Sequence, residues 1–492
     1  MNAVRITEGV YWVGAIDWNL RNFHGYETEK GSTYNAYLVI DEKITLIDAV
    51  KEPFKEEMLS RIASVIDPAK IDVIVSNHAE PDHSGALPYI KSIAKNAKIY
   101  AAFGAGIKDL SAYYGDLGYV GVKAGESLCI GKRTLTFVPT PMVHWPDNMV
   151  SYMTPENILF SNDAFGQHYA SDERLDTECD LPEAYIQARK YYANIVQPYG
   201  MQTGKALDAL AGLKIDMICP SHGIVWTKHI PEILALYKSW VANEYDDTAI
   251  IVYDTMWHST EAMAHAIENA FLAAGYKPRL YNLHYCHNSD VIADAMTAKY
   301  IAVGSPTLNN NMMPSVASFL TYFKGLNGNK KKYIAFGSYG WGGQSPDQVS
   351  EALKSPKCEA LLPAIKIAYK PSDEQLKKIE QDVLEALKIQ SPLPFFCLTR
   401  IFSLKKRTGG GGGPPAFSLP EAFIFRTLPA SKCLCRAVRG IFRHSRARIR
   451  RRTRLRSHSR RDPLRPLPCA ALFCRERRIS SRRRRRACRT AL

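Results

Sequence analysis

Four side chains that can bind metal ions lie within the short segment 77–83, whose sequence is Asn-His-Ala-Glu-Pro-Asp-His. They are His78, Glu80, Asp82 and His83. The apolar residues 71–75 precede them and predict a buried strand, so the segment would form the loop at the end of that strand. Imidazole and carboxylate groups on a loop held by a strand can converge on one or two metal ions. The alternative is a polar loop with two incidental histidines.

Three further side chains of this kind follow apolar, strand-like segments in the first 246 residues. They are His144 after residues 133–139, Asp163 after residues 157–161 and His222 after residues 215–219. The strand ends of a packed layer open into the same crevice, so the four loops are predicted to meet at one metal site. Simpler roles stay open for two of these residues, because His144 could pack against Trp145 and Asp163 could cap a helix.

A loop of another kind occurs later in the chain and is typical of an anion site. The apolar residues 248–253 predict a strand, residues 254–260 form a loop rich in hydroxyl groups, and residues 261–274 predict an amphipathic helix. Backbone N–H groups, hydroxyls and the helix dipole would all face a phosphate bound there. The chain lacks the pattern Gly-x-x-x-x-Gly-Lys, which disfavours a nucleoside triphosphatase.

Two more strand–loop units follow, at residues 300–309 and 333–343, and the three units together resemble a flavodoxin. In that family FMN lies across the strand ends at the switch point of a doubly wound sheet. The resemblance implies that the three loops bind FMN, with small residues letting the backbone approach the flavin and Tyr339 or Trp341 stacking on it. The candidate residues are Thr255, Met256, Trp257, His258, Ser259, Thr260, Ser305, Pro306, Thr307, Leu308, Asn309, Ser338, Tyr339, Gly340, Trp341, Gly342 and Gly343.

The order His-x-Glu-x-Asp-His, followed by His, Asp and His, resembles the metallo-β-lactamase fold in its flavodiiron variant. Hydrolases of that fold carry His-x-His-x-Asp-His and bind zinc, whereas this chain has Glu80 at the position of the second histidine. The set therefore contains three carboxylates. Hard oxygen donors favour iron and stabilise its ferric state, whereas zinc has no redox chemistry.

This resemblance covers residues 1–390 and implies two iron ions with one shared ligand. It assigns His78, Glu80 and His144 to one iron, Asp82, His83 and His222 to the other, and Asp163 to a bridge between them. Whether His83 is a direct ligand stays open, because this position does not always bind metal in the family. Three residues could donate a hydrogen bond or a proton to a group at the irons, with ordinary packing as the alternative. They are His24, Tyr26 and Tyr191.

Flavodiiron proteins reduce dioxygen to water, nitric oxide to nitrous oxide, or both, while FMN relays electrons from a donor such as rubredoxin. The resemblance therefore implies an oxidoreductase of this kind. It also implies a head-to-tail homodimer, or a dimer of such dimers, in which the FMN of one subunit meets the irons of its partner. Two other classes stay open. One is a zinc-dependent hydrolase with an accessory flavodoxin part, and the other is an electron carrier with a vestigial metal domain.

Three segments make up the chain. Residues 1–246 are predicted to form a metallo-β-lactamase-like αββα sandwich and residues 247–390 a flavodoxin-like doubly wound parallel sheet, so that both belong to the α/β class. Residues 391–492 carry 28 basic and 3 acidic side chains, compared with 64 and 48 in the whole chain. The excess of positive charge is therefore confined to this low-complexity, arginine-rich tail, which we expect to be disordered and not to serve nucleic-acid binding.

Cysteine use and apolar patterning favour a cytoplasmic protein without a membrane segment. The first 390 residues contain five scattered cysteines and no disulfide framework. No Cys-x-x-Cys pair occurs, so a fused rubredoxin is not expected and the electrons would come from a separate donor. The first ten residues lack the apolar core of a signal peptide, and no apolar stretch of about eighteen residues predicts a transmembrane helix.

Overall fold

The computed structural model of the protein describes residues 1–326, 331–354 and 358–390. Two stacked sheets form its N-terminal half. The first sheet has seven strands in the spatial order β1-β2-β7-β8-β9-β10-β11. These are β1 (Val4–Thr7), β2 (Val10–Trp12), β7 (Tyr37–Val39), β8 (Thr45–Ile47), β9 (Val73–Ser76), β10 (Lys98–Ala102) and β11 (Tyr119–Val122). The second sheet consists, in spatial order, of β12 (Ser127–Cys129), β13 (Thr134–Pro139), β14 (Met149–Thr154), β15 (Ile158–Asn162) and β16 (Met217–Pro220).

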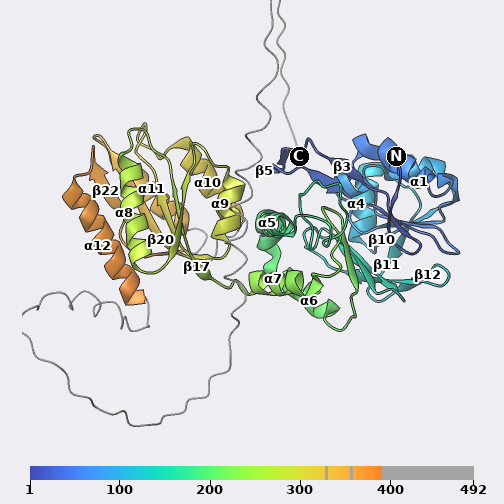
Figure 1. Ribbon diagram of the computed structural model, residues 1–492. Helices are drawn as coiled ribbons and strands as arrows, with labels where there is room; N and C mark the ends of the chain where they lie inside the picture. The colour runs from blue at the N-terminus through green and yellow to red at the C-terminus, as the bar shows by residue number, and fades with distance from the viewer. Residues whose placement is uncertain (327–330, 355–357, 391–492) are drawn as a thin grey trace, which may run out of the picture. The chain divides into compact units, whose positions relative to one another are not determined.

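Successive residues of the buried strands pack on opposite sides of their sheet, which produces four layers. In β9, Val73 and Val75 pack between the two sheets, whereas Ile74 packs against the helices outside the first sheet. Those helices are α1 (Lys55–Ala63), α3 (Leu87–Ile93) and α4 (Ala105–Tyr114), and the second sheet is covered by α5 (Leu181–Tyr191), α6 (Gly200–Leu210) and α7 (Ile230–Ala242). Figure 1 shows α1 on one side of the sheets and α5 and α7 on the other. The predicted αββα sandwich is confirmed.

Strand direction brings three of the four expected metal loops to one edge of the second sheet. Strand β14 is antiparallel to both β13 and β15, and β15 is parallel to β16. Therefore β13, β15 and β16 run in the same direction and end at the same edge. Together with β9, these strands lie within two residues of the segments that the sequence predicted.

Short elements connect the layers. Two small sheets pair β3 (Ala15–Asp17) with β6 (Ser32–Tyr34) and β4 (Asn22–Phe23) with β5 (Tyr26–Glu27). The short helices are η1 (Glu52–Phe54), η2 (Pro68–Lys70), α2 (Pro81–Ser84), η3 (Tyr192–Val196) and η4 (Gln197–Tyr199). Helix α2 begins at Pro81, shortly after β9 ends at Ser76, and carries part of the metal loop.

The second half contains a parallel sheet in the order β18-β17-β19-β20-β21, with β22 also paired to β20. This is the strand order of a flavodoxin-like doubly wound fold. The strands are β17 (Asp246–Tyr253), β18 (Lys277–Asn282), β19 (Ala298–Gly304), β20 (Lys332–Tyr339), β21 (Glu359–Ala360) and β22 (Ile365–Ala368). The helices are α8 (Ser259–Ala273), α9 (Asn288–Ala295), α10 (Pro314–Gly325), α11 (Ser345–Lys354) and α12 (Asp373–Gln390).

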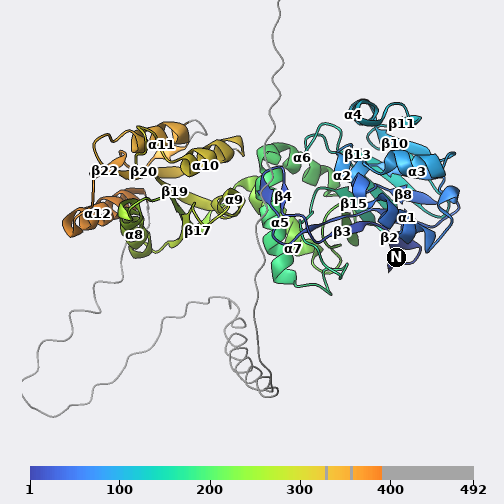
Figure 2. The same ribbon diagram turned by 90° about the horizontal axis from the view of Figure 1, so that it is seen from above.

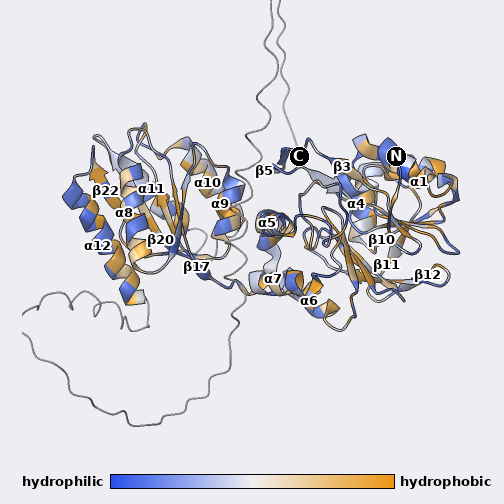
Figure 3. Cartoon of the chain, viewed as in Figure 1, coloured by the Kyte–Doolittle hydropathy of each residue, from blue (hydrophilic) through white to orange (hydrophobic). Residues whose placement is uncertain are grey.

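Helices cover both faces of this sheet because its central strands are apolar on both sides. Ile251 of β17 packs with α8 and α12, whereas its neighbours Ile250 and Val252 pack with α9, α10 and α11. Figure 2 shows α8 and α12 on one side of the sheet and α10 and α11 on the other. In Figure 3 the central strands are mostly orange, whereas α12 carries both blue and orange along its length. Continuous apolar strands are typical of a parallel sheet buried on both faces.

The end of the first half and the start of the second lie close together in the sequence, since α7 ends at Ala242 and β17 begins at Asp246. The helix predicted at residues 261–274 is confirmed as α8. No helix among the described residues is both long and apolar enough to cross a membrane. The predicted tail, residues 391–492, lies outside the described residues.

Candidate metal centre and flavin cavity

All seven predicted metal ligands lie together where strands of the N-terminal half end. His78 and Glu80 follow β9, Asp82 and His83 lie in α2, and the other three follow β13, β15 and β16. They form two groups, within each of which the ligand atoms lie no more than 4.8 Å apart: His78, Glu80, His144 and Asp163, and Asp82, His83 and His222. We call these the first and the second metal group. Six of the seven residues are buried, and the His144 side chain is 13% exposed.

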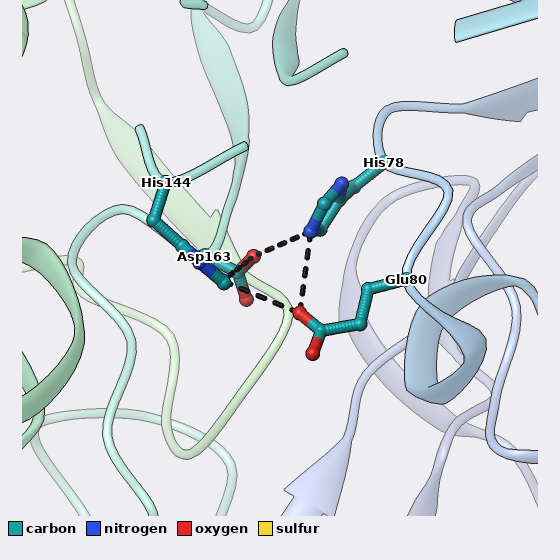
Figure 4. Close-up of side chains that lie close together, drawn as sticks. All are labelled: His78, Glu80, His144 and Asp163. Carbon is teal, nitrogen blue, oxygen red and sulfur yellow. Dashed lines mark hydrogen bonds and ion pairs between the residues drawn. The ribbon is translucent and has the colours of Figure 1, made fainter. Parts of the chain in front are cut away.

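In the first metal group two imidazole nitrogens face two carboxylate oxygens. Glu80 Oε2 lies 3.3 Å from His78 Nε2 and 3.3 Å from His144 Nε2. Asp163 Oδ2 lies 3.5 Å from His78 Nε2 and 3.4 Å from His144 Nε2. Figure 4 shows the two rings and the two carboxylates pointing toward one another. Nitrogen and oxygen donors around a common point are a ligand set for a transition metal.

The second metal group repeats this arrangement with the other oxygen of Asp163. Asp82 Oδ1 lies 3.3 Å from His83 Nε2, and Asp82 Oδ2 lies 3.3 Å from His222 Nε2. Asp163 Oδ1 lies 3.0 Å from His83 Nε2 and 3.6 Å from His222 Nε2. Since Asp163 directs one oxygen to each group, it has the geometry of a carboxylate that bridges two metal ions. His83 Nε2 faces the same carboxylates as His222 Nε2, which supports a direct role for His83.

Several buried polar atoms at this centre make no hydrogen bond. They are both carboxylate oxygens of Asp82, both ring nitrogens of His83, and Asp163 Oδ2. Buried polar atoms normally find a partner, because leaving one without a partner costs free energy. A metal ion in each group would satisfy four of these five atoms, so the residues present fit a pair of cations.

The electrostatics of the centre also favour cations. Burial would lower the pKa of His78, but the carboxylates of Asp147 and Glu80 raise it to about 10. Burial would likewise lower the pKa of His83, yet Asp82 and Asp163 raise it to about 9. The surplus of negative charge therefore draws protons onto His78 and His83 in the metal-free site. Metal ions replace such protons, because a histidine binds metal in its neutral form.

Two of the three predicted proton or hydrogen-bond donors contact ligands. The Tyr191 hydroxyl donates to Asp163 Oδ1 at 2.9 Å. His24 Nε2 lies 3.1 Å from Glu80 Oε1, and this contact raises the pKa of His24. The hydroxyl of Tyr26 is buried and makes no hydrogen bond, and the Tyr26 ring packs 5.2 Å from the ring of His168. A metal-directed role for Tyr26 therefore stays a prediction, without a contact to support it.

Two groups that contact the predicted ligands, and so fix their orientation, were not predicted from the sequence. The Asp147 carboxylate lies 3.0 Å from His78 Nδ1 and accepts a hydrogen bond from the Ala79 backbone N–H at 2.6 Å. The Thr33 carbonyl oxygen lies 2.6 Å from His222 Nδ1. Asp147 could have been suspected, because it is a carboxylate in the same loop as His144. The carbonyl of Thr33 leaves no signal in the sequence, since every residue has one.

In the second half a cavity of about 800 Å³ opens at the strand ends. It is lined by Met256, Trp257, Ser259, Pro306, Thr307, Leu308, Asn309, Asn310, Ser338, Tyr339, Gly340, Trp341, Gly342, Tyr369 and Lys370. Ser259 is the first residue of α8, so the N-terminus of that helix faces the cavity and can hold a phosphate. Trp257 and Trp341 are 86% and 93% exposed, and their faces are available to a planar ring. The cavity has the size and the chemistry that FMN requires.

Most of the predicted flavin-binding residues line this cavity, but five do not: Thr255, His258, Thr260, Ser305 and Gly343. The buried Thr260 hydroxyl lies 2.9 Å from Ser338 Oγ, and the buried Ser305 hydroxyl donates to the Pro306 carbonyl. His258 pairs with Glu261 at 2.6 Å. Thr260 and Ser305 therefore hold the loops in place, because short polar side chains there bond to the loops themselves.

Three residues that were not predicted from the sequence also line the cavity: Asn310, Tyr369 and Lys370. Tyr369 and Lys370 follow β22, the short strand beside β20, which was not predicted either. At Gly337 a side chain is excluded, because a Cβ there would lie 1.9 Å from the Ser305 carbonyl oxygen. This close approach keeps the loops after β19 and β20 together at the cavity.

Two family models match the chain, one in each half. The ODP family beta lactamase model matches residues 33–223, and the flavodoxin model matches residues 251–381. The chain is 43% identical to the nitric oxide reductase of Moorella thermoacetica over 382 residues, which are 76% of this chain and 96% of that protein. It is 42% identical to the rubredoxin-oxygen oxidoreductase of Megalodesulfovibrio gigas over 397 residues, which are 79% of this chain and 99% of that protein.

Solved structures extend these similarities to the fold. The rubredoxin oxygen:oxidoreductase from Desulfovibrio gigas matches with a TM-score of 0.76 and 42% identity, covering 79% of this chain and 99% of that one. The flavodiiron protein from Giardia intestinalis matches with a TM-score of 0.76 and 35% identity, covering 79% of this chain and 96% of that one. The similarity therefore includes both the metal-binding half and the half with the flavin cavity.

Proposed function

Because the chain belongs to the flavodiiron protein family, it is an oxidoreductase, and we propose that it reduces dioxygen, nitric oxide or both at a diiron centre with electrons relayed by FMN. Relatives named as a nitric oxide reductase and as a rubredoxin-oxygen oxidoreductase support this activity. The structural observation that carries the proposal is the pair of facing metal groups joined by the two oxygens of Asp163.

We assign one iron to the first metal group and one to the second, with Asp163 as the shared ligand. The two irons, when bound, supply neighbouring redox-active positions for a diatomic substrate. Glu80 gives the set a hard oxygen donor where zinc hydrolases of this fold carry a histidine, and such donors favour iron. The burial of Asp82 and Asp163 keeps bulk water away from the reacting atoms.

Two protein side chains lie where they could donate protons or hydrogen bonds near a bound substrate. His24 contacts Glu80 Oε1 through Nε2, while its side chain is 73% exposed. It can therefore take a proton from solvent and hold it next to a metal ligand. The buried Tyr191 hydroxyl donates a hydrogen bond to Asp163 Oδ1 and thereby orients that carboxylate. The same hydroxyl could donate its proton at the metal centre. We propose positioning and proton-donating roles for these residues, with His24 as the connection to solvent.

We assign FMN to the cavity of the second half. Its phosphate would lie at the N-terminus of α8 beside Ser259, where helix N–H groups and the hydroxyl favour an anion. Its ring would lie against Trp257, Tyr339 or Trp341. When bound, FMN accepts and delivers electrons one at a time. Residues 1–246 and 247–390 would thus be separate metal and flavin domains.

The other two classes are less well supported. A zinc-dependent hydrolase needs no flavin, and the relatives that match both halves of this chain are named as oxidoreductases. An electron carrier with a vestigial metal domain would not need to keep both metal groups, yet every one of the seven ligands is present and oriented toward the others.

We propose a separate, rubredoxin-like electron donor and a head-to-tail dimer in which the FMN of one subunit faces the irons of the other. The exposed rings of Trp257 and Trp341 beside the flavin cavity support a contact there, because large exposed apolar surfaces mark binding sites. We also propose a cytoplasmic location, since the five cysteines among the described residues are free thiols.

The direct test of function is gas turnover by the full chain, purified without oxygen and supplied with reduced rubredoxin. Gas electrodes would follow dioxygen and nitric oxide in separate runs, and the ratio of the two rates would define the preferred substrate. The Glu80→His variant should shift the metal content toward zinc and abolish turnover, while FMN content stays unchanged. Undiminished turnover by this variant would show that Glu80 is not a ligand.

A second experiment tests the head-to-tail dimer by mixing two inactive variants. One lacks the irons (His78→Ala with Asp163→Ala), and the other lacks FMN (Ser259→Asp with Asn309→Asp). In the proposed dimer, co-expressed heterodimers contain one intact pair of cofactors and recover part of the activity. No recovery, with heterodimers confirmed and both variants folded, would mean that electrons pass within one chain.

A further inference from the structure

Asp147 stands directly behind a metal ligand without being one. Its carboxylate oxygens lie 3.1 and 3.0 Å from Nδ1 of His78, whose opposite nitrogen, Nε2, faces Glu80 and Asp163. Asp147 Oδ2 also accepts the hydrogen bond of the Ala79 N–H. The Asp147 side chain is 1% exposed, so solvent does not screen its charge. This carboxylate therefore fixes both the ring and the backbone of the loop between His78 and Glu80.

The second metal group has no counterpart of Asp147 among the described residues. Behind His222, Nδ1 contacts the backbone carbonyl of Thr33 at 2.6 Å and the hydroxyl of Ser32 at 3.4 Å, neither of which carries a net charge. His83 Nδ1 makes no hydrogen bond at all. One further side chain touches a ligand carboxylate in each group: His24 contacts Glu80 in the first, and Tyr191 contacts the second-group oxygen of Asp163. The difference between the groups is therefore the buried carboxylate in contact with His78 Nδ1, because the buried carboxylate of Asp48, which interacts electrostatically with His83, bonds to Asn77 instead.

We propose that Asp147 is a positioning residue that makes the first metal group the stronger of two unequal metal sites. It holds His78 with hydrogen on Nδ1 and the lone pair of Nε2 toward the metal, and its charge strengthens that nitrogen as a donor. The second group, held by a neutral carbonyl, binds its ion more weakly and loses it first. The inference rests on the proposed function only in assigning iron, since the inequality holds for any divalent ion.

The test is a titration of metal-free full-length protein with Co²⁺, whose visible spectrum reports each binding phase. Wild-type protein should bind in two phases of different affinity. The Asp147→Asn variant keeps the shape of the side chain, but it carries no charge, and an NH2 group that cannot accept a hydrogen bond replaces one of the two oxygens beside His78 Nδ1. We expect it to weaken the tighter phase about 10- to 100-fold and leave the other phase unchanged. FMN content should also stay unchanged.

Asp176→Asn is the matched control. Asp176 is also fully buried and also contacts both a histidine Nδ1 and a backbone N–H, those of His229 at 3.1 and 2.8 Å. His229 belongs to neither metal group. The control variant should therefore leave both Co²⁺ phases unchanged. An equal loss in the two variants would assign the effect to general loss of structure and overturn the proposal.

Two ligand variants identify the phases. His144→Ala should remove the phase that Asp147→Asn weakens, and His222→Ala should remove the other. If Asp147→Asn weakens both phases equally, weakens neither, or weakens the one lost in His222→Ala, the proposal is wrong. These readouts do not involve gas turnover. A protein with two unequal Co²⁺ sites and no gas reduction would contradict the proposed function and leave this inference standing.

Discussion

The seven predicted metal ligands lie near strand ends in the interior of the first half, whereas the predicted flavin cavity opens to solvent between loops of the second half. His78, His83 and His222 have side chains that are no more than 1% exposed, while Trp257 and Trp341 are 86% and 93% exposed. A metal ion requires particular ligand atoms. A flavin is held mainly by shape, backbone N–H groups and hydroxyls, which many residue types can supply. A substitution in one half should therefore release the cofactor of that half and leave the other cofactor bound.

The largest effect should follow the loss of Asp163. Because this carboxylate directs an oxygen to each metal group, Asp163→Ala should release both irons and reduce gas turnover about 100-fold or more. FMN content should be the same as in wild-type protein. The prediction is tested by measuring the iron and FMN content of the same sample. Loss of FMN together with iron would mean that cofactor binding in one half depends on the other half.

The next largest effect should come from a negative charge at the N-terminus of α8. In Ser259→Asp the added carboxylate would lie where the FMN phosphate is expected, and repulsion between like charges should weaken FMN binding about 100-fold. Iron content should not change. Ser318→Asp is the control, because Ser318 is an exposed residue of the same half that does not line the cavity. Equal loss of FMN in both variants would contradict the placement of the FMN phosphate at the N-terminus of α8.

A smaller effect should distinguish the metal-free from the iron-loaded protein as the pH changes. The pKa values of His78 and His83 are raised to about 10 and about 9, above the usual value of about 6.5. Their protonation therefore stabilises the metal-free fold fully below pH 6.5, and this stability is lost as the pH rises through 9 to 10. We expect the Tm of metal-free protein to fall by about 5 °C between pH 7 and pH 10.

Iron-loaded protein is the control for this pH dependence, because bound metal takes the place of the protons. Its Tm, measured by scanning calorimetry in the same buffers, should change much less over the same range. If the two forms lose stability in parallel, the histidines of the metal groups are not the cause.

The smallest effect should come from removing residues 391–492. Their composition, 28 basic against 3 acidic side chains, gives no basis for a hydrophobic core. The shortened protein should keep its iron, its FMN and its turnover within experimental error. Any salt-sensitive binding to nucleic acid should disappear with the tail. A shortened protein that lost either cofactor would show that the boundary at residue 390 is misplaced.

The sequence was most informative where the chemistry demands specific residues. The ligand segment at 77–83 and the strand-end positions of His144, Asp163 and His222 were sufficient to predict one metal centre, and the structure brings all seven side chains together. The αββα layers were expected from the resemblance to the metallo-β-lactamase fold, and β9 and the nearby strands β7 and β8 agree with it as short strands that are buried throughout.

It was least informative where backbone or tertiary packing determines the site. The Thr33 carbonyl behind His222 cannot be read from a side chain, and Asp147 acquires its role only when its loop folds back on Ala79. In the flavin half, Thr260 and Ser305 have the right chemistry for a phosphate site but bond to the loops instead. Hydroxyl-rich loops show that an anion can bind, and only the fold decides which hydroxyl faces it.

The most direct test of the central claim is metal and flavin quantitation on the full chain purified without oxygen. The ligand chemistry predicts about two irons and about one FMN per chain, with little zinc, in protein that also reduces dioxygen or nitric oxide. Elemental analysis and the flavin absorption spectrum of one sample provide both numbers. Protein that contained zinc in place of iron, or that lacked FMN when fully folded, would contradict the assignment of a flavodiiron oxidoreductase.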